Sequence, residues 1–335
     1  MPRPLGSASD KDLGVDGSGS AQTAAGGRPL PIPLSTREHA RLVSFLRERS
    51  RPVDILPPPD LPEPFSSLAG RPLTRRPRVL VLDVYGTLVS SGAGEVGSAA
   101  APAESHMAAL GELLAEYGLE EGPAEFEARL AGEIRKEHRT AREAGVPWPE
   151  IDGAALLARL TGRSLPEARR LGAAREAVLN PVVPMPGAEN LLKQARRSGL
   201  ALGLVSNAQY YTEPALEAAF GCTLDVLGFD PELRVWSWRL GRAKPDPELF
   251  WIIVRTLERR GVRPEEAVYI GNDLLNDIAP AKACGLRTAL FAGDPRSLRL
   301  RAGDSRVKGV LPDTVLGSFH GAGAVFRLGG RDPFR

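Results

Sequence analysis

Short apolar runs recur along the chain and alternate with amphipathic stretches. Each run is too short to cross a membrane and is bounded by turn-forming residues, so each predicts a buried strand. The intervening stretches repeat apolar residues at helical spacing. The runs are 79–82, 200–205, 267–270 and 288–291, and the main helical stretches that alternate with them are 187–198, 212–220, 247–260 and 275–284. This alternation predicts an α/β fold with a Rossmann-like, doubly wound parallel sheet.

The interval after the first predicted strand has a different pattern. No strand signal interrupts residues 90–183, and three segments have helical periodicity, at about 104–117, 123–143 and 151–178. The chain therefore leaves the sheet after one strand, builds an all-helical unit and returns near Pro184. The predicted core comprises 78–89 and 184–317, with 90–183 inserted as a helical cap. Two weaker strands are expected, at 224–227 and from Val310 onward.

The flanking segments have patterns of their own. Residues 1–34 are rich in Gly, Ser and Ala without periodicity, which predicts a disordered tail. Ser35 and Glu38 form a capping-box pattern, so the segment 35–77 is expected to hold a helix over about 36–50, followed by a proline-rich connector. Residues 318–335 are interpreted as a loose tail.

Composition narrows the class of protein. The 335 residues are 42% hydrophobic and 25% charged, as in ordinary globular chains, and a net charge of +2 gives no reason to expect a nucleic-acid or membrane partner. Two cysteines, Cys222 and Cys284, exclude a disulfide framework. With no long apolar run and no secretory signal, we expect a cytoplasmic protein; its oligomeric state is left open. Only six of the 43 Lys and Arg residues are Lys, so a single Arg is weak evidence of function.

Polar side chains follow three of the predicted strands. Asp83 ends the first, Ser206 the second and Asp273 the third, while Lys244 precedes a proline in a loop. Taken singly, each is ordinary: a turn-forming Asp or Ser, a surface Lys, an acidic helix start. Because the carboxyl ends of parallel strands share one edge of the sheet, the four together predict a site there.

These residues stand in motifs that resemble the haloacid dehalogenase-like hydrolase superfamily over about 78–295. The four motifs occur in the expected order; nothing in 1–75 belongs to the resemblance. The motifs are Asp83-Val84-Tyr85-Gly86-Thr87, Leu204-Val205-Ser206-Asn207, Lys244-Pro245-Asp246-Pro247, and Gly271-Asn272-Asp273 with Asp277. The resemblance implies a helical cap of the C1 type and a small-molecule substrate.

The resemblance also implies roles for particular residues. Asp83 would be the nucleophile that forms a covalent intermediate. Lys244 would hold Asp83 and the transferring group, and Ser206 would bind phosphate oxygens. Thr87 and Asn207 would contact the substrate.

A Mg²⁺ ion is the implied cofactor. Mg²⁺ prefers oxygen ligands, and Asp83, the carbonyl of Tyr85 and Asp273 would supply them. Asp277 would orient Lys244 or the waters of the metal.

Tyr85 departs from the phosphatase pattern. Phosphatases of the superfamily usually carry a second Asp there, which protonates the leaving oxygen; a Tyr resembles the L-2-haloacid dehalogenases. His106 and His138 of the cap are candidate substitutes for that acid. The leading expectation is a Mg²⁺-dependent phosphatase acting on a small phosphorylated metabolite. The alternatives are a metal-independent 2-haloacid dehalogenase and a catalytically weak binding or regulatory protein of the same fold.

Overall fold

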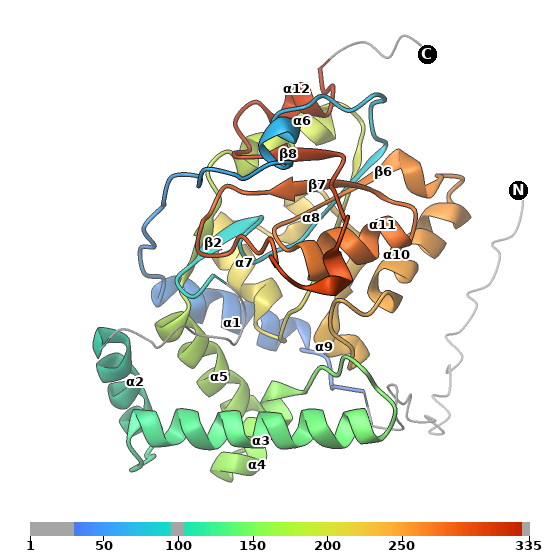
Figure 1. Ribbon diagram of the computed structural model, residues 1–335. Coiled ribbons are helices and arrows are strands. Elements are labelled where there is room, and N and C mark those ends of the chain that lie inside the picture. Colours follow the sequence, from blue (N-terminus) through green and yellow to red (C-terminus); the bar gives the residue numbers. More distant parts are fainter. Residues whose placement is uncertain (1–29, 95–103, 330–335) are drawn as a thin grey trace, which may run out of the picture.

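Six parallel strands form the central sheet of the computed structural model, which describes residues 30–94 and 104–329 (Figure 1). The strand order is β5-β4-β1-β6-β7-β8, with every pairing parallel. The chain fills one side of β1 first and the other side afterwards, so the sheet is doubly wound, as predicted. The strands are β1 (Val79–Leu82), β4 (Ala201–Ser206), β5 (Phe229–Trp236), β6 (Ala267–Gly271), β7 (Arg287–Phe291) and β8 (Thr314–Leu316).

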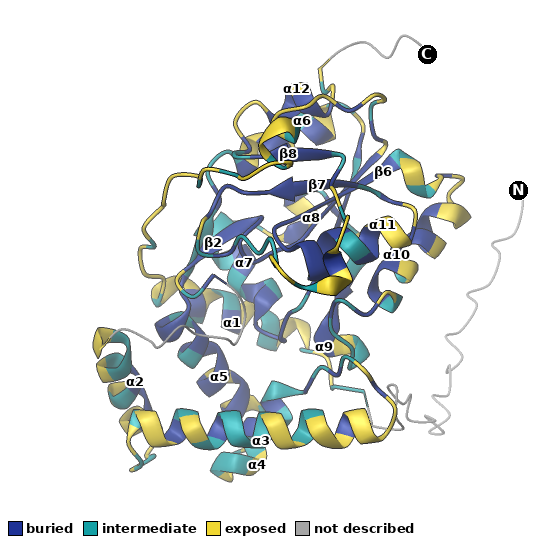
Figure 2. Cartoon of the chain, in the orientation of Figure 1, coloured by how far each residue is buried: buried dark blue, intermediate teal, exposed yellow. Residues whose placement is uncertain are grey.

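Helices cover both faces of the sheet, which explains why the central strands β1 and β6 are apolar and buried along their whole length. Leu80 and Leu82 of β1 pack in one cluster with α6 (Ala188–Arg197) and α7 (Thr212–Phe220). Val79 and Val81 point to the opposite face and pack in a second cluster with α10 (Glu248–Arg259). Alternate side chains of a strand face opposite sides, so both sets must be apolar when both faces are covered. Figure 2 shows the strands as buried.

Within the described residues, the inserted unit consists of four helices with their own apolar core. They are α2 (Glu104–Glu116), α3 (Pro123–Glu143), α4 (Gly153–Thr161) and α5 (Leu165–Leu179). The stretch 151–178 is thus two helices, because Gly162 takes a left-handed conformation after α4 and Ser164 caps α5. The chain enters and leaves through a small antiparallel ribbon of β2 (Val89–Ser91) and β3 (Val182–Pro184).

The N-terminal helix α1 (Thr36–Glu48) begins with the predicted capping box. It packs on α7 of the core and on α5 of the helical unit. Phe45 contacts the apolar clusters of both. Polar links run the same two ways: His39 Nε2 lies 2.8 Å from Glu217 Oε2 on α7, and Arg169 on α5 lies 2.9 Å from Glu38. The helix therefore bridges the two parts of the molecule.

The segment 224–227, expected to be a strand, is instead the short helix α8 (Leu224–Leu227). Thr223 caps its start through a hydrogen bond from the Val226 amide, and Gly228 ends it with φ +96°. The edge strand β5 follows. It contains Pro231, which an edge strand tolerates because one side of its backbone has no partner strand.

The prediction of a loose tail from residue 318 was also wrong for residues 318–329, the part that the structure describes. Phe319 and Phe326 are buried, and α12 (Ala322–Val325) packs against α6. Phe319 stacks on Phe291 of β7 with ring centroids 4.3 Å apart. Residues 330–335, like most of the predicted N-terminal tail, lie outside the described residues.

Short elements complete the chain. They are η1 (Ser66–Leu68), α9 (Ser237–Leu240), η2 (Pro264–Glu266), the π-helical turn η3 (Leu274–Ile278), α11 (Ala279–Ala283) and η4 (Ser305–Val307). Among the described residues, none of the helices combines the length and apolarity that a membrane span requires.

Replacing His39 by Gln is expected to flatten the pH dependence of stability. The hydrogen bond to Glu217 outweighs burial and raises the pKa of His39 above its usual 6.5. The folded state thus binds this proton more tightly, so the stabilisation is complete below pH 6.5 and is lost as pH rises through the raised pKa. Because the pair is partly exposed, it contributes no more than about 1 kcal/mol.

The measurement is the free energy of unfolding at pH 6 and pH 8.5. Wild type should exceed His39→Gln by more at pH 6 than at pH 8.5. Arg37→Gln changes an exposed residue of the same helix and should leave the pH dependence unchanged. Equal differences at the two pH values would show that His39 carries no such linkage.

Candidate active site

The carboxyl ends of three adjacent strands bring the predicted residues to one edge of the sheet. Leu82 of β1 is level with Leu204 of β4 and Ile270 of β6. Asp83 follows directly, and its amide donates to the Ile270 carbonyl at 2.9 Å, which extends the strand pairing through the carboxylate residue. Asp83 thus lies in the middle of the sheet, at the point where the strand order reverses, and this is where ligands bind in open α/β sheets.

Lys244 links two of the carboxylates. Its Nζ lies 2.8 Å from Asp83 Oδ1 and 2.6 Å from Asp277 Oδ1. The side chain is only 3% exposed. Burial would lower the pKa of Lys244, but the charges of Asp277 and Asp83 outweigh burial and raise it. The lysine is therefore a fixed cation beside one oxygen of Asp83.

Asp277 connects Lys244 to the backbone at the end of β6. Its Oδ2 accepts the amides of Asn272 and Asp273, both at 3.0 Å, and its Oδ1 also accepts the Tyr269 hydroxyl. The π-helical turn η3 directs it back under the strand end. Gly271 makes this approach possible, since a Cβ there would lie 2.5 Å from Asp277 Cγ.

Other predicted residues are engaged with the protein itself. The side chain of Asn207 holds the Lys244 backbone from both sides: Oδ1 accepts the amide at 2.7 Å and Nδ2 donates to the carbonyl at 3.3 Å. Thr87 donates to Asn272 Oδ1 at 3.0 Å, and Ser206 Oγ donates to the Asn207 carbonyl. Asn207 thus positions the lysine loop, while Ser206 ends β4 and Thr87 is held at the residue after β6.

Asp273 is an ion-pair partner of Arg301, a residue that the sequence did not single out. Arg301 donates through Nε and Nη2 to the two carboxylate oxygens. Two carboxylates and a backbone carbonyl are the hard oxygen donors that Mg²⁺ requires. The Asp273 carboxylate, however, is not available to an ion while Arg301 holds it. Within the described residues, no group of three or more His, Cys, Asp or Glu side chains could hold a metal.

A loop after β7 packs on the turn that follows Asp83. Asp294 accepts the Ser90 hydroxyl at 2.6 Å, and the Ser297 carbonyl accepts Asn272 Nδ2 at 2.6 Å. Gly86, at φ +74°, contacts this loop so closely that a Cβ would lie 2.2 Å from Ser297 Cβ. The glycine of the first motif therefore serves both the turn and the close approach.

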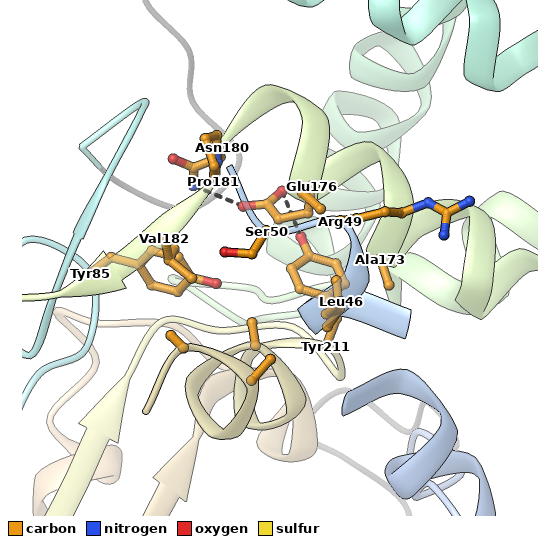
Figure 3. A pocket seen from close by; sticks show the side chains of 14 residues that line it. Leu46, Arg49, Ser50, Tyr85, Ala173, Glu176, Asn180, Pro181, Val182 and Tyr211 are labelled. Carbon is orange, nitrogen blue, oxygen red and sulfur yellow. Dashed lines mark hydrogen bonds between the residues drawn. The ribbon is translucent and has the colours of Figure 1, made fainter. Parts of the chain in front are cut away.

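Tyr85 lines a pocket between the helical unit, α7 and the end of α1 (Figure 3). Its hydroxyl lies 3.2 Å from Thr212 Oγ1. Burial raises the pKa of Tyr85 above its usual value. The pocket holds about 30 Å³, on the order of two water molecules. In this closed arrangement a metabolite does not fit there.

The ionisable cap residue in that pocket is Glu176. It accepts the Tyr211 hydroxyl at 3.1 Å and Asn180 Nδ2 at 2.8 Å (Figure 3), and burial raises its pKa. His106 and His138, the cap residues considered from sequence, lie on α2 and α3 and do not line the pocket. Nothing in the sequence distinguished Glu176 from the many other charged residues of the helical segments.

A doubly wound sheet with a helical insertion after β1, and with a buried carboxylate–lysine–carboxylate cluster at its strand ends, defines a class of α/β hydrolytic enzymes. A sequence model of haloacid dehalogenase-like hydrolases matches residues 77–285. The chain belongs to this family, as its motifs predicted.

Curated relatives of the chain include phosphatases. The phosphoserine phosphatase of Thermus thermophilus is 35% identical over 127 residues, 36% of this chain and 48% of that protein. The glyceraldehyde 3-phosphate phosphatase of Methanopyrus kandleri is 33% identical over 105 residues, 31% of this chain and 42% of that protein. The chain thus spans just under half the length of these two relatives.

Among solved structures, a 2-haloacid dehalogenase of Pseudomonas syringae is similar at 21% identity, with a TM-score of 0.49 over 75% of this chain and 98% of that one.

Proposed function

We propose that the protein is a phosphatase that hydrolyses a small phosphorylated metabolite through Asp83. The observation that carries the proposal is the position of Asp83: a carboxylate at the sheet's switch point, with Lys244 2.8 Å from one of its oxygens. That geometry holds the carboxylate in place beside a fixed cation, as a nucleophile requires. The matches to curated phosphatases support the reaction class.

The proposed reaction has two steps. A carboxylate oxygen of Asp83 attacks phosphorus, and the leaving-group oxygen departs with the electron pair of the broken P–O bond. Water then attacks the phosphorus of the aspartyl phosphate, which releases inorganic phosphate and restores Asp83. Lys244 stays charged throughout and stabilises negative charge on the transferring group. Ser206, at the end of β4, and Thr87, in the turn after Asp83, are the proposed hydroxyl donors to the phosphoryl oxygens.

Residues 90–183 are proposed to act as the cap over this site. The pocket beside Tyr85 lies between that unit and the core, so it is the proposed place of the leaving group. Mg²⁺ is proposed as the cofactor, held by Asp83, the Tyr85 carbonyl and Asp273 once Arg301 releases that carboxylate. When bound, the ion would neutralise charge on the phosphoryl oxygens.

Tyr85 supports a second candidate, a metal-independent 2-haloacid dehalogenase, because halide leaves without a proton. A third candidate, a protein that keeps the fold with little turnover, is favoured by the closed pocket.

A screen of phosphate esters and 2-haloacids, each with Mg²⁺ and with a chelator, distinguishes the three candidates. The phosphatase should release phosphate, and the Asp83→Asn variant should not. Halide release in chelator would establish the dehalogenase. Absence of turnover of every activated substrate would support the third candidate.

A further inference from the structure

We propose that Arg301 is a competitor of the divalent cation: its guanidinium holds Asp273, so a metal ion binds this site only by displacing it. The inference rests on the proposed function, because it concerns the same site, but it predicts a binding equilibrium and not a rate.

The contact is two-pronged. Arg301 Nε lies 3.1 Å from Asp273 Oδ1, and Nη2 donates to Oδ2. Parallel bonds from a guanidinium to both oxygens of a carboxylate are among the strongest side-chain interactions. The Asp273 side chain is 7% exposed, so solvent screens the pair little from that side.

The remaining acceptor capacity of Asp273 is also used. Oδ1 accepts the amides of Leu275 at 2.8 Å and Asn276 at 3.3 Å, and Oδ2 accepts Asn276 Nδ2 at 3.0 Å. Each oxygen therefore has at least two donors. The amide donors belong to the turn that carries Asp273 and hold its carboxylate in place. Arg301 is the partner from elsewhere in the chain, and thus the one that an ion can replace.

The backbone holds Arg301 where it is. Its loop pairs with the active-site turn: the Arg299 amide donates to the Asn272 carbonyl, and the Leu274 amide donates to the Arg299 carbonyl, both at 2.9 Å. Two residues later Arg301 has φ +52°, a left-handed conformation that non-glycine residues seldom adopt. In a chain with many arginines, this fixed and strained placement on a site carboxylate distinguishes Arg301 from a surface charge.

Charge explains why the competition matters. Asp83 and Asp273 lie close enough to Asp277 for their charges to act on it. Lys244 pairs with Asp83 and Asp277 but not with Asp273, so the cluster retains negative charge that favours a divalent cation. Arg301 neutralises part of it with a permanent, planar charge. An ion must therefore compete with a cation that belongs to the chain. Its apparent affinity is the intrinsic affinity multiplied by the fraction of molecules in which Arg301 has released Asp273.

The experiment is calorimetric titration of the apoprotein with MgCl₂ alone. Arg301→Gln should bind Mg²⁺ at least about 10-fold more tightly than wild type, since the competitor is gone. Arg301→Lys, which keeps the charge but loses the two-pronged contact, should fall between them. Arg306→Gln is the matched control: Arg306 is in the same loop and pairs with Asp304, so its loss should leave Mg²⁺ affinity as in wild type.

A further variant locates the effect. Adding Asp273→Asn to Arg301→Gln should remove the gain in affinity. Melting temperatures verify that each variant is folded. If Arg301→Gln does not fold, the Mg²⁺ affinity of Arg301→Lys tests the proposal instead. Equal or weaker Mg²⁺ binding by the folded Arg301 variants would overturn the proposal. Because binding is measured without substrate, the result stands apart from any failure to find phosphatase activity.

Discussion

Replacement of Asp83 by Asn is expected to lower kcat for every substrate by at least about 10³-fold. An amide oxygen cannot form the covalent intermediate, and no other carboxylate takes its place, because Asp277 lies behind Lys244 and Asp273 is held by Arg301. The measurement is kcat for an activated aryl phosphate in Mg²⁺, with aspartyl phosphate detected by trapping in wild type alone.

The variant is expected to stay folded. Lys244 keeps its 2.6 Å contact with Asp277 and its bond to the Tyr269 hydroxyl, so no buried charge is left without a partner. Asp304→Asn, at an exposed pair in the loop after β7, is the control and should retain full activity. Turnover of Asp83→Asn equal to that of wild type would remove the nucleophile from the proposal.

Tyr85 is expected to limit the range of substrates. A phenol titrates near pKa ~10 in water, and burial raises the pKa of Tyr85 further, so it cannot serve as a ready proton donor at neutral pH. Aryl and acyl phosphates, whose leaving groups depart without a proton, should be hydrolysed well, and alkyl phosphates poorly. The difference in kcat/KM should approach the 10²–10⁴-fold that general acid catalysis typically contributes.

Tyr85→Asp should then raise kcat/KM for an alkyl phosphate while changing that for an aryl phosphate little. Glu176 is the ionisable cap residue of the adjacent pocket, and its buried carboxyl has a raised pKa. Efficient alkyl phosphate hydrolysis by wild type would contradict the prediction. If Glu176→Gln then removed that activity but kept aryl phosphate hydrolysis, Glu176 would be the acid in place of Tyr85.

The sheet and the position of Asp83 at its edge were predictable because both depend on local pattern. A strand covered on both faces must be apolar at every position, as in 79–82, and such a run ending in Asp83 is conspicuous in any sequence. The capping box before α1 is equally local, since the side chains of Ser35 and Glu38 each accept the other residue's backbone amide.

The sequence predictions failed where tertiary packing determines the local structure or the role of a residue. Asp230 and Pro231 interrupt the apolar pattern by which a strand is recognised in sequence, so β5 was not predicted. An edge strand accepts such residues, whereas a central strand excludes them. The segment around Phe319 is short and rich in glycine, yet the stacking on Phe291 fixes it. Arg301 and Glu176 were missed for the same reason: each reaches the site from a distant element, and many other residues of the same types have no such role.

The bridging position of α1 has a consequence for substrate entry. In the proposed reaction the helical unit and the core would separate to admit a metabolite beside Tyr85, and α1 cannot follow both. If it stays on α7, each opening breaks the Arg169–Glu38 pair and the contact of Phe45 with the cap. If it follows the cap, the His39–Glu217 pair is lost instead. In the proposed opening, the free energy of these contacts would add to the barrier, so that a segment outside the matched residues 77–285 would slow the enzyme.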